Sequence, residues 1–91
     1  MKVAGLSFRV YSQRGDDDLQ HHVEWETACA AAIKGSVGTQ TAYVIDVYAK
    51  NATAARRFGG EAAELAFKGL DSPSKVLERI EVRADSLGGG Y

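Results

Sequence analysis

Residues 43–50 read YVIDVYAK, and residues 51–68 read NATAARRFGGEAAELAFK directly after them. In the first stretch Tyr43, Ile45, Val47 and Ala49 alternate with the residues between them, and β-branched and aromatic side chains dominate, so the pattern predicts a strand. From Ala52 the apolar positions recur at helical spacing, with charged residues on the other side. The chain therefore combines a strand with an amphipathic helix.

The ends and the middle of this helix carry further signals. Asn51 is in place to cap its N-terminus, and Gly69 marks its end. Gly59 and Gly60 lie inside it, where each glycine costs about 1 kcal/mol relative to alanine. Their presence indicates that the backbone approaches a neighbour closely there, or that the helix bends.

Two more strands flank this unit. Ala4, Leu6, Phe8 and Val10 alternate along residues 4–10 and predict a first strand with one apolar face. Residues 14–18, RGDDD, have the composition of a turn. Asp71-Ser72-Pro73 interrupts the chain after the helix, and the alternation over residues 79–84 predicts a last strand.

Residues 19–34 are ambiguous, because their apolar positions alternate as in a strand while alanine, glutamate and leucine favour a helix. We prefer a strand, with residues 34–38 as a hairpin connection to residues 43–50. The order is then β-β-β-α-β, a small β-grasp-like α+β domain with one main helix on a four-stranded sheet. Its last strand is able to lie parallel to the first strand of the hairpin. The alternative is β-α-β-α-β, with a helix over residues 18–34.

Composition limits the class of protein. The chain has 91 residues, 45% hydrophobic and 25% charged, which suits one small globular domain without a large enclosed active site. Its formal net charge is −1, so nothing in the overall charge favours nucleic acid. No apolar run approaches the ~18 residues of a membrane span, and Cys29 is the only cysteine. We expect a cytoplasmic protein without membrane contact, with a domain over residues 1–85 and a tail over residues 86–91.

The tail contains Leu87-Gly88-Gly89-Gly90-Tyr91. Glycine lets a chain enter a slot too narrow for side chains. A small domain of grasp-like order whose last strand leads into such a tail resembles the ubiquitin-like modifiers and sulfur carriers, in particular bacterial modifiers found in antiphage operons. Because members of this family end in glycine, Tyr91 departs from the mature pattern.

The resemblance implies a specific chemistry for the tail. A processing peptidase removes Tyr91, and an activating enzyme adenylates the carboxylate of Gly90 with ATP and takes it over as a thioester. A conjugating enzyme then passes Gly90 to a target protein. In this interpretation Gly88, Gly89 and Gly90 form the conjugation tail, and the chain is a substrate of enzymes and not an enzyme. It binds no cofactor itself, because the activating enzyme uses the ATP.

Two other motifs carry weaker signals. His21 and His22, near Asp16, Asp17 and Asp18, suggest a metal site, but adjacent residues of a strand point to opposite faces and do not easily share an ion. We therefore expect solvated residues and no metal. Cys29 is interpreted as a core residue, because neither histidine is placed to act as its base.

A second functional hypothesis concerns the sheet. Its face opposite the helix is predicted to carry Arg9, Tyr11, Tyr48, Lys50, Arg79 and Arg83. Of these residue types, Tyr and Arg are enriched at protein interfaces. The chain would then be a non-catalytic interaction module, such as a phage or bacterial accessory or inhibitor protein. Nucleic-acid binding ranks third, because Asp46 and Glu81 lie among these residues. A partly solvated sheet face without a partner is the plainer alternative.

Overall fold

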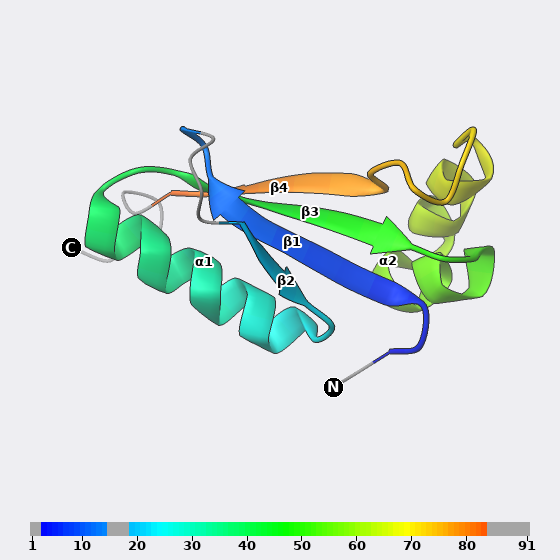
Figure 1. The fold of residues 1–91 in the computed structure, drawn as a ribbon. Helices are drawn as coiled ribbons and strands as arrows, with labels where there is room; N and C mark the ends of the chain where they lie inside the picture. Colours follow the sequence, from blue (N-terminus) through cyan, green and yellow to red (C-terminus); the bar gives the residue numbers. More distant parts are fainter. Residues whose placement is uncertain (1–2, 15–18, 84–91) are drawn as a thin grey trace.

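The computed structural model describes residues 3–14 and 19–83 and shows a four-stranded sheet with two helices (Figure 1). The elements follow in the order β-β-α-β-α-β, namely β1 (Leu6–Ser12), β2 (Gln20–His22), α1 (Trp25–Thr39), β3 (Tyr43–Ala49), α2 (Ala52–Lys68) and β4 (Glu78–Val82). The α+β class and the four-stranded sheet agree with the sequence-based prediction. The mixed order of strands and helices is consistent with a β-grasp-like arrangement.

The sheet has the order β2-β1-β3-β4, and all pairings among the described residues are antiparallel. Its central pair is β1 with β3, which runs from Leu6 opposite Ala49 to Ser12 opposite Tyr43. Successive side chains of a strand point to opposite faces, so one face collects the core residues of both strands. Helix α1 covers this face, and α2 lies at one end of the sheet (Figure 1).

Most of the predicted elements are present. The structure contains the strands predicted around residues 4–10, 43–50 and 79–84 and the helix that follows residue 51. The first strand begins later than expected, because Gly5 takes a positive φ of 88° in the turn that precedes it. The predicted cap is also confirmed, since Oδ1 of Asn51 accepts a hydrogen bond of 2.8 Å from the amide of Ala54.

The strand preferred for residues 19–34 is wrong. Only Gln20–His22 is a strand, and α1 occupies Trp25–Thr39, so residues 34–38 lie in the helix and not in a hairpin connection. The domain thus has two helices instead of one main helix. The last strand is also not parallel to a neighbour, because β4 pairs antiparallel with β3. The alternative order β-α-β-α-β is closer to the observed order, although it does not include β2.

The packing of α1 explains why the alternation was misleading. The buried side of α1 consists of small side chains four residues apart, Ala28, Ala32 and Ser36, all with 0% exposure. The larger Ile33 and Val37 are exposed. A pattern read from the large apolar residues therefore follows the wrong face, whereas the alanine propensity for helix was the better guide.

Small residues let α1 lie close to the sheet. An added Cβ at Gly35 would stand 2.5 Å from the ring of Tyr43 on β3, well inside van der Waals contact. Gly38, one turn further along, has open space around the same position. A larger residue at position 35 would therefore displace the ring of Tyr43.

Helix α2 bends at its two glycines, as one of the two sequence-based alternatives required. Gly59 and Gly60 have non-helical dihedral angles, and Gly60 lies at φ 72° and ψ −155°, a region open almost only to glycine. The segment before the bend brings Phe58 against Phe8 and Trp25, with ring centroids 5.4 to 6.1 Å apart. This aromatic cluster joins α2, β1 and the start of α1.

The contrast between Gly35 and Gly38 gives a matched pair of variants in one helix. We expect Gly35→Ala to lower the free energy of unfolding by about 1–3 kcal/mol, because its methyl group would overpack against Tyr43. Gly38→Ala should raise it by about 0.5–1 kcal/mol through helix propensity alone. Urea unfolding measures both, and stabilisation by Gly35→Ala would contradict this packing.

Candidate functional site

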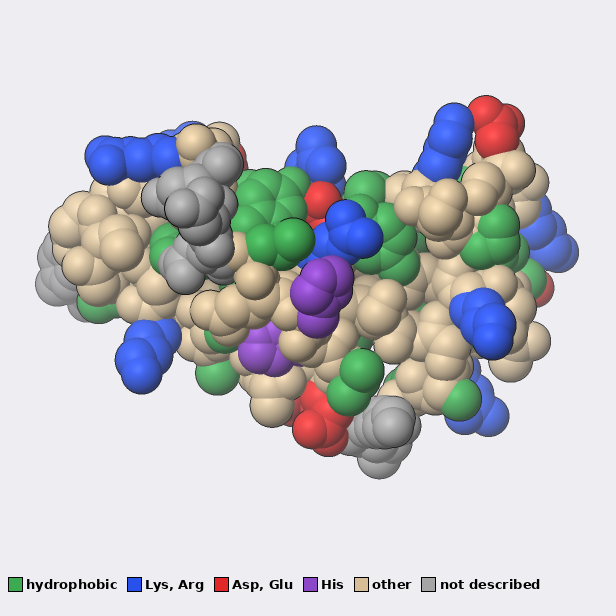
Figure 2. Space-filling model, in the orientation of Figure 1, with side chains coloured by type: hydrophobic (Ala, Val, Ile, Leu, Met, Phe, Trp, Pro, Cys, Tyr) green, Lys and Arg blue, Asp and Glu red, His purple; other side chains and the backbone are tan. Residues whose placement is uncertain are grey.

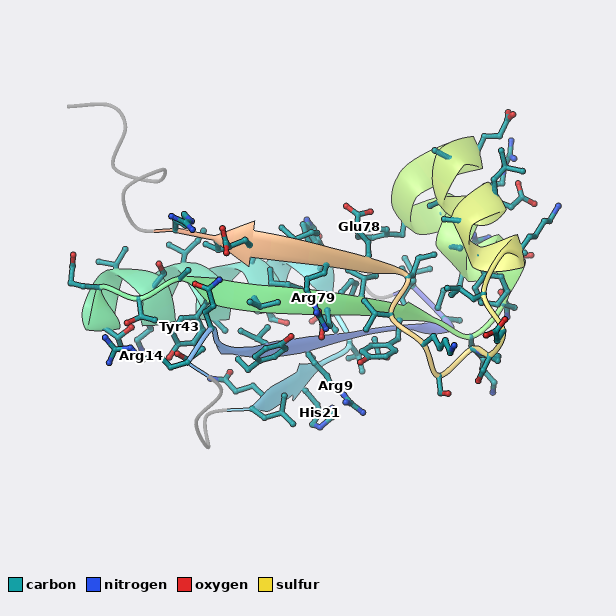
Figure 3. All side chains as sticks on the ribbon, turned by 90° about the horizontal axis from the view of Figure 1, so that it is seen from above. Arg9, Arg14, His21, Tyr43, Glu78 and Arg79 are labelled. Carbon is teal, nitrogen blue, oxygen red and sulfur yellow. The ribbon has the colours of Figure 1, made fainter. Side chains whose placement is uncertain are left out.

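The candidate site is the open sheet face, defined as the face of the sheet opposite α1. Its side chains come from alternate positions of all four strands: Ser7, Arg9 and Tyr11; His21; Val44, Asp46 and Tyr48; Arg79 and Glu81. Strand register places His21, Arg9, Asp46 and Arg79 opposite one another in a row. Figure 3 shows the three labelled members, His21, Arg9 and Arg79, in a band across the strands.

Asp46 is the buried centre of this row. Its residue is only 4% exposed, and its two carboxylate oxygens accept hydrogen bonds from Arg79, from Nε at 2.7 Å and from Nη2 at 3.0 Å. The Arg79 side chain itself is 63% exposed. The adjacent carboxylate raises the pKa of the Arg79 guanidinium, so this group stays charged. The result is a bidentate pair with one buried and one exposed partner.

Tyr11 approaches Asp46 from β1, on the other side. Its hydroxyl donates a 2.8 Å hydrogen bond to Oδ2 of Asp46. Burial, and then this hydrogen bond, raise the pKa of Tyr11 above its ordinary value of 10.0. The resulting contribution to stability is complete below that pH and is lost as the pH rises through the higher folded-state pKa. One carboxylate thus ties β1, β3 and β4 together.

Arg9 and Tyr48 form a second contact on the open sheet face. The guanidinium carbon of Arg9 lies 5.0 Å from the centre of the Tyr48 ring, within the range of a cation–π interaction. Arg9 is exposed, Tyr48 is half-buried, and His21 lies beside Arg9 in the register. Figure 2 shows a basic side chain directly next to one of the two histidines. The exposed charge of Arg9 is therefore held in a defined position.

A third set of contacts occupies the end of the face near the β4 terminus. Nε2 of Gln13 donates to Oε2 of Glu81 at 2.7 Å, and Nε of Arg83 donates to Oε1 of Glu81 at 2.7 Å. These partners are exposed, so the contacts contribute little to stability. They orient side chains at the rim of the face.

The structure brings four of the proposed interaction residues, Arg9, Tyr11, Tyr48 and Arg79, onto one face, and Arg83 follows β4 at its rim. The sequence-based interpretation treated Asp46 only as a charge that weakens binding. Its organising role was missed, although a lone carboxylate between apolar residues of a strand, with Arg and Tyr on the neighbouring strands, was the available signal. Asp16–Asp18, Gly88–Gly90 and Tyr91 lie outside the described residues.

His22 and Cys29, the other residues considered as site candidates, have local contacts within the fold. His22 contacts Oγ1 of Thr27 at 3.2 Å and Oε1 of Gln20 at 3.0 Å. Cys29 is a free, half-buried cysteine in α1, and burial, followed by the charge of Glu26, raises the pKa of its thiol. Over residues 3–14 and 19–83, no three His, Cys, Asp or Glu residues are grouped as metal ligands, and neither helix is long and apolar enough to cross a membrane.

Comparison with known proteins gives no match to a family model, to a curated protein or to a solved structure.

The asymmetry of the Asp46–Arg79 pair predicts unequal costs of mutation. Arg79→Ala leaves a buried carboxylate without its cation and should lower the free energy of unfolding more than Asp46→Asn does. Asp46→Asn leaves the exposed guanidinium in water and should cost about 1–2 kcal/mol.

Arg83→Ala is the control. It also removes an arginine from an ion pair, but its partner Glu81 is exposed. We expect its cost to stay below about 1 kcal/mol. Chemical denaturation of the three variants would contradict the account if Arg79→Ala were no more costly than Asp46→Asn.

Proposed function

We propose that this protein works without catalysis, by binding another protein through the open sheet face. The observation that carries the proposal is the exposed Arg9 guanidinium, held over the ring of Tyr48 beside a row whose central carboxylate is already neutralised. Arginine and tyrosine dominate the energetics of protein interfaces because they combine a large contact area with directional hydrogen bonds.

The ordered side chains of the open sheet face support a role in protein binding. Side chains that are fixed before binding lose less conformational entropy when a partner arrives. Tyr11 and Arg79 are held by Asp46, and Arg9 is held by Tyr48, so several side chains of the open sheet face are already ordered. Neither helix covers this face, since α1 packs on the other one.

The charges of the face indicate the chemistry of the partner. Of the three exposed arginines, Arg79 pairs with Asp46 and Arg83 pairs with Glu81, whereas Arg9 lies over the ring of Tyr48 and pairs with no carboxylate of the described residues. The guanidinium of Arg9 is able to hold a carboxylate in a bidentate pair. We therefore propose a partner that presents aspartate or glutamate side chains to this face.

The same geometry gives less support to nucleic-acid binding. Bases bind to open sheets by stacking on exposed aromatic rings. The ring of Tyr48 already has Arg9 over it, and the hydroxyl of Tyr11 is engaged by Asp46. No contact of the described residues favours this function, so it is not proposed further.

A photo-crosslinking amino acid at Ser7, an exposed position of the open sheet face, should capture the partner in native cells, whereas one at Glu61 of α2 should not. Against the purified partner, Arg9→Ala and Tyr48→Ala should each weaken the complex by about 2 kcal/mol or more, measured by calorimetry.

Arg14→Ala is the matched control, because Figure 3 places this exposed arginine beyond the end of β1, away from the band of Arg9 and Arg79. Its complex should keep the wild-type affinity. Equal effects of Arg9→Ala and Arg14→Ala, or equal capture from Glu61, would refute binding through this face.

We propose conjugation as a ubiquitin-like modifier as the second candidate. Its specific support is the run Gly88-Gly89-Gly90, which follows the last strand by a few residues. Removal of Tyr91 would expose Gly90 for adenylation and transfer to a target. The antiparallel pairing of β4 differs from the parallel pairing that the resemblance implies, so this candidate depends on the tail and not on strand order.

We propose a cytoplasmic location for either candidate. The free thiol of Cys29 is in keeping with a reducing compartment. ATP, an activating enzyme, a conjugating enzyme and a peptidase would be partners of the second candidate only.

The second candidate predicts the fate of one residue. Intact-mass analysis of protein from native cells should show chains that lack Tyr91, together with covalent adducts. Deletion of residues 89–91 should abolish the adducts and leave thermal unfolding unchanged. Chains that retain Tyr91 and carry no adduct, in cells with the native gene neighbourhood, would exclude conjugation.

A further inference from the structure

We propose that a cleft on the core side of the sheet binds a free α-amino acid with an apolar side chain. The cleft has a volume of about 500 Å³ and lies among β1, the first two residues of α1, the bend of α2 and β4. Its sheet residues, such as Phe8 and Ile80, alternate with those of the open sheet face and so point the other way. The site is therefore separate from the proposed protein-binding face.

The wall of the cleft is aromatic. Phe8, Trp25 and Phe58 form the cluster that joins three elements, and all three line the cleft together with Leu6 and Ile80. Phe8 is almost fully buried, whereas Trp25 and Phe58 are half-buried and keep part of their rings accessible. An apolar side chain of a ligand would bury its surface against these accessible ring faces.

The same cleft carries two opposite charges that do not neutralise each other. Arg57 of α2 and Glu78 of β4 both line it and are exposed. Within the described part of the chain, neither forms an ion pair or a side-chain hydrogen bond. Glu26 also lines the cleft, but hydrogen bonding to its carboxylate lowers its pKa, so this group is already engaged.

A zwitterion matches this distribution of charge. The carboxylate of an amino acid is able to form a bidentate pair with the guanidinium of Arg57, and its ammonium group is able to pair with Glu78. Its side chain would then enter the aromatic part of the cleft. Pockets that hold small ligands combine such an apolar lining with a few polar groups, at volumes of about 300–1,000 Å³.

The bend of α2 belongs to the same site. Gly59 lines the cleft, and the next residue, Gly60, has the glycine-only conformation described above. Glycine adopts this conformation without a steric penalty, so the helix breaks here at little cost. Here the bend places Arg57 and Phe58 on one side of the break, against the cleft.

Trp25 is the only tryptophan, so its fluorescence reports on the cleft directly. We expect a saturable change when L-phenylalanine is titrated into the full chain. Two analogues test the charges: 3-phenylpropionate lacks the ammonium group, and phenethylamine lacks the carboxylate. Each should bind at least about tenfold more weakly than L-phenylalanine, because each leaves one charged hydrogen bond unmade.

Variants assign each charge to its residue. Arg57→Gln should bind L-phenylalanine and phenethylamine equally, and Glu78→Gln should bind L-phenylalanine and 3-phenylpropionate equally. Arg56→Gln is the matched control, because the neighbouring arginine pairs with Glu64 and does not line the cleft. It should keep the wild-type affinity and the wild-type order of the three ligands.

Three results would overturn the proposal. The first is no saturable signal from wild-type protein up to about 10 mM L-phenylalanine, about ten times a Kd of 1 mM. The second is equal binding of all three ligands, which would indicate an apolar cleft without charge selection. The third is an equal loss of affinity in Arg56→Gln and Arg57→Gln. The wild-type comparison decides the matter even if a variant fails to fold.

Discussion

A buried carboxylate in the middle of β3 constrains the whole sheet. Asp46 accepts hydrogen bonds from Tyr11 on β1 and from Arg79 on β4, so its charge is tolerated only when both neighbouring strands are in register. A shift of either strand by one residue would turn its partner to the other face. The same contacts leave Arg79 exposed and, with Arg9 over Tyr48, give the open sheet face its ordered charges.

The opposite face of the sheet is built by close packing. Ala28 and Ala32 bring α1 near the strands, and Gly35 allows its backbone to pass over Tyr43. Phe8, Trp25 and Phe58 then fill the wider space where α2 meets the sheet. Narrow packing at one end and aromatic packing at the other leave the cleft beside Trp25.

The elements with a strong periodic pattern of apolar residues were predicted correctly from the sequence. The strand over Tyr43–Ala49, the Asn51 cap and the helix after it all follow from local patterns. The two glycines indicated either a close approach or a bend, and the structure shows the bend. Residues 19–34 were misassigned because the buried face of α1 is made of alanine and serine, which carry little periodic signal, while its exposed Ile33 mimics a strand pattern. The packing of α1 against the sheet, and not the local pattern of apolar residues, determines the structure of this segment.

The candidate site was also predictable only in part. Alternation was enough to group Arg9, Tyr11, Tyr48 and Arg79 on one face, because strand geometry fixes the direction of side chains. Which of them remain available could not be predicted, since that depends on which strands are neighbours. Only the sheet order reveals that Asp46 engages Tyr11 and Arg79, and that Arg9 lies over Tyr48.

The most direct test of binding through the open sheet face is the NMR spectrum of the ¹⁵N-labelled chain, recorded while the purified partner is added. Our account predicts that amide shifts change mainly around Arg9 on β1, Tyr48 on β3 and Arg79 on β4, with little change in α1 and α2. Changes centred on the exposed Ile33 and Val37 of α1, or confined to residues 84–91, would contradict it.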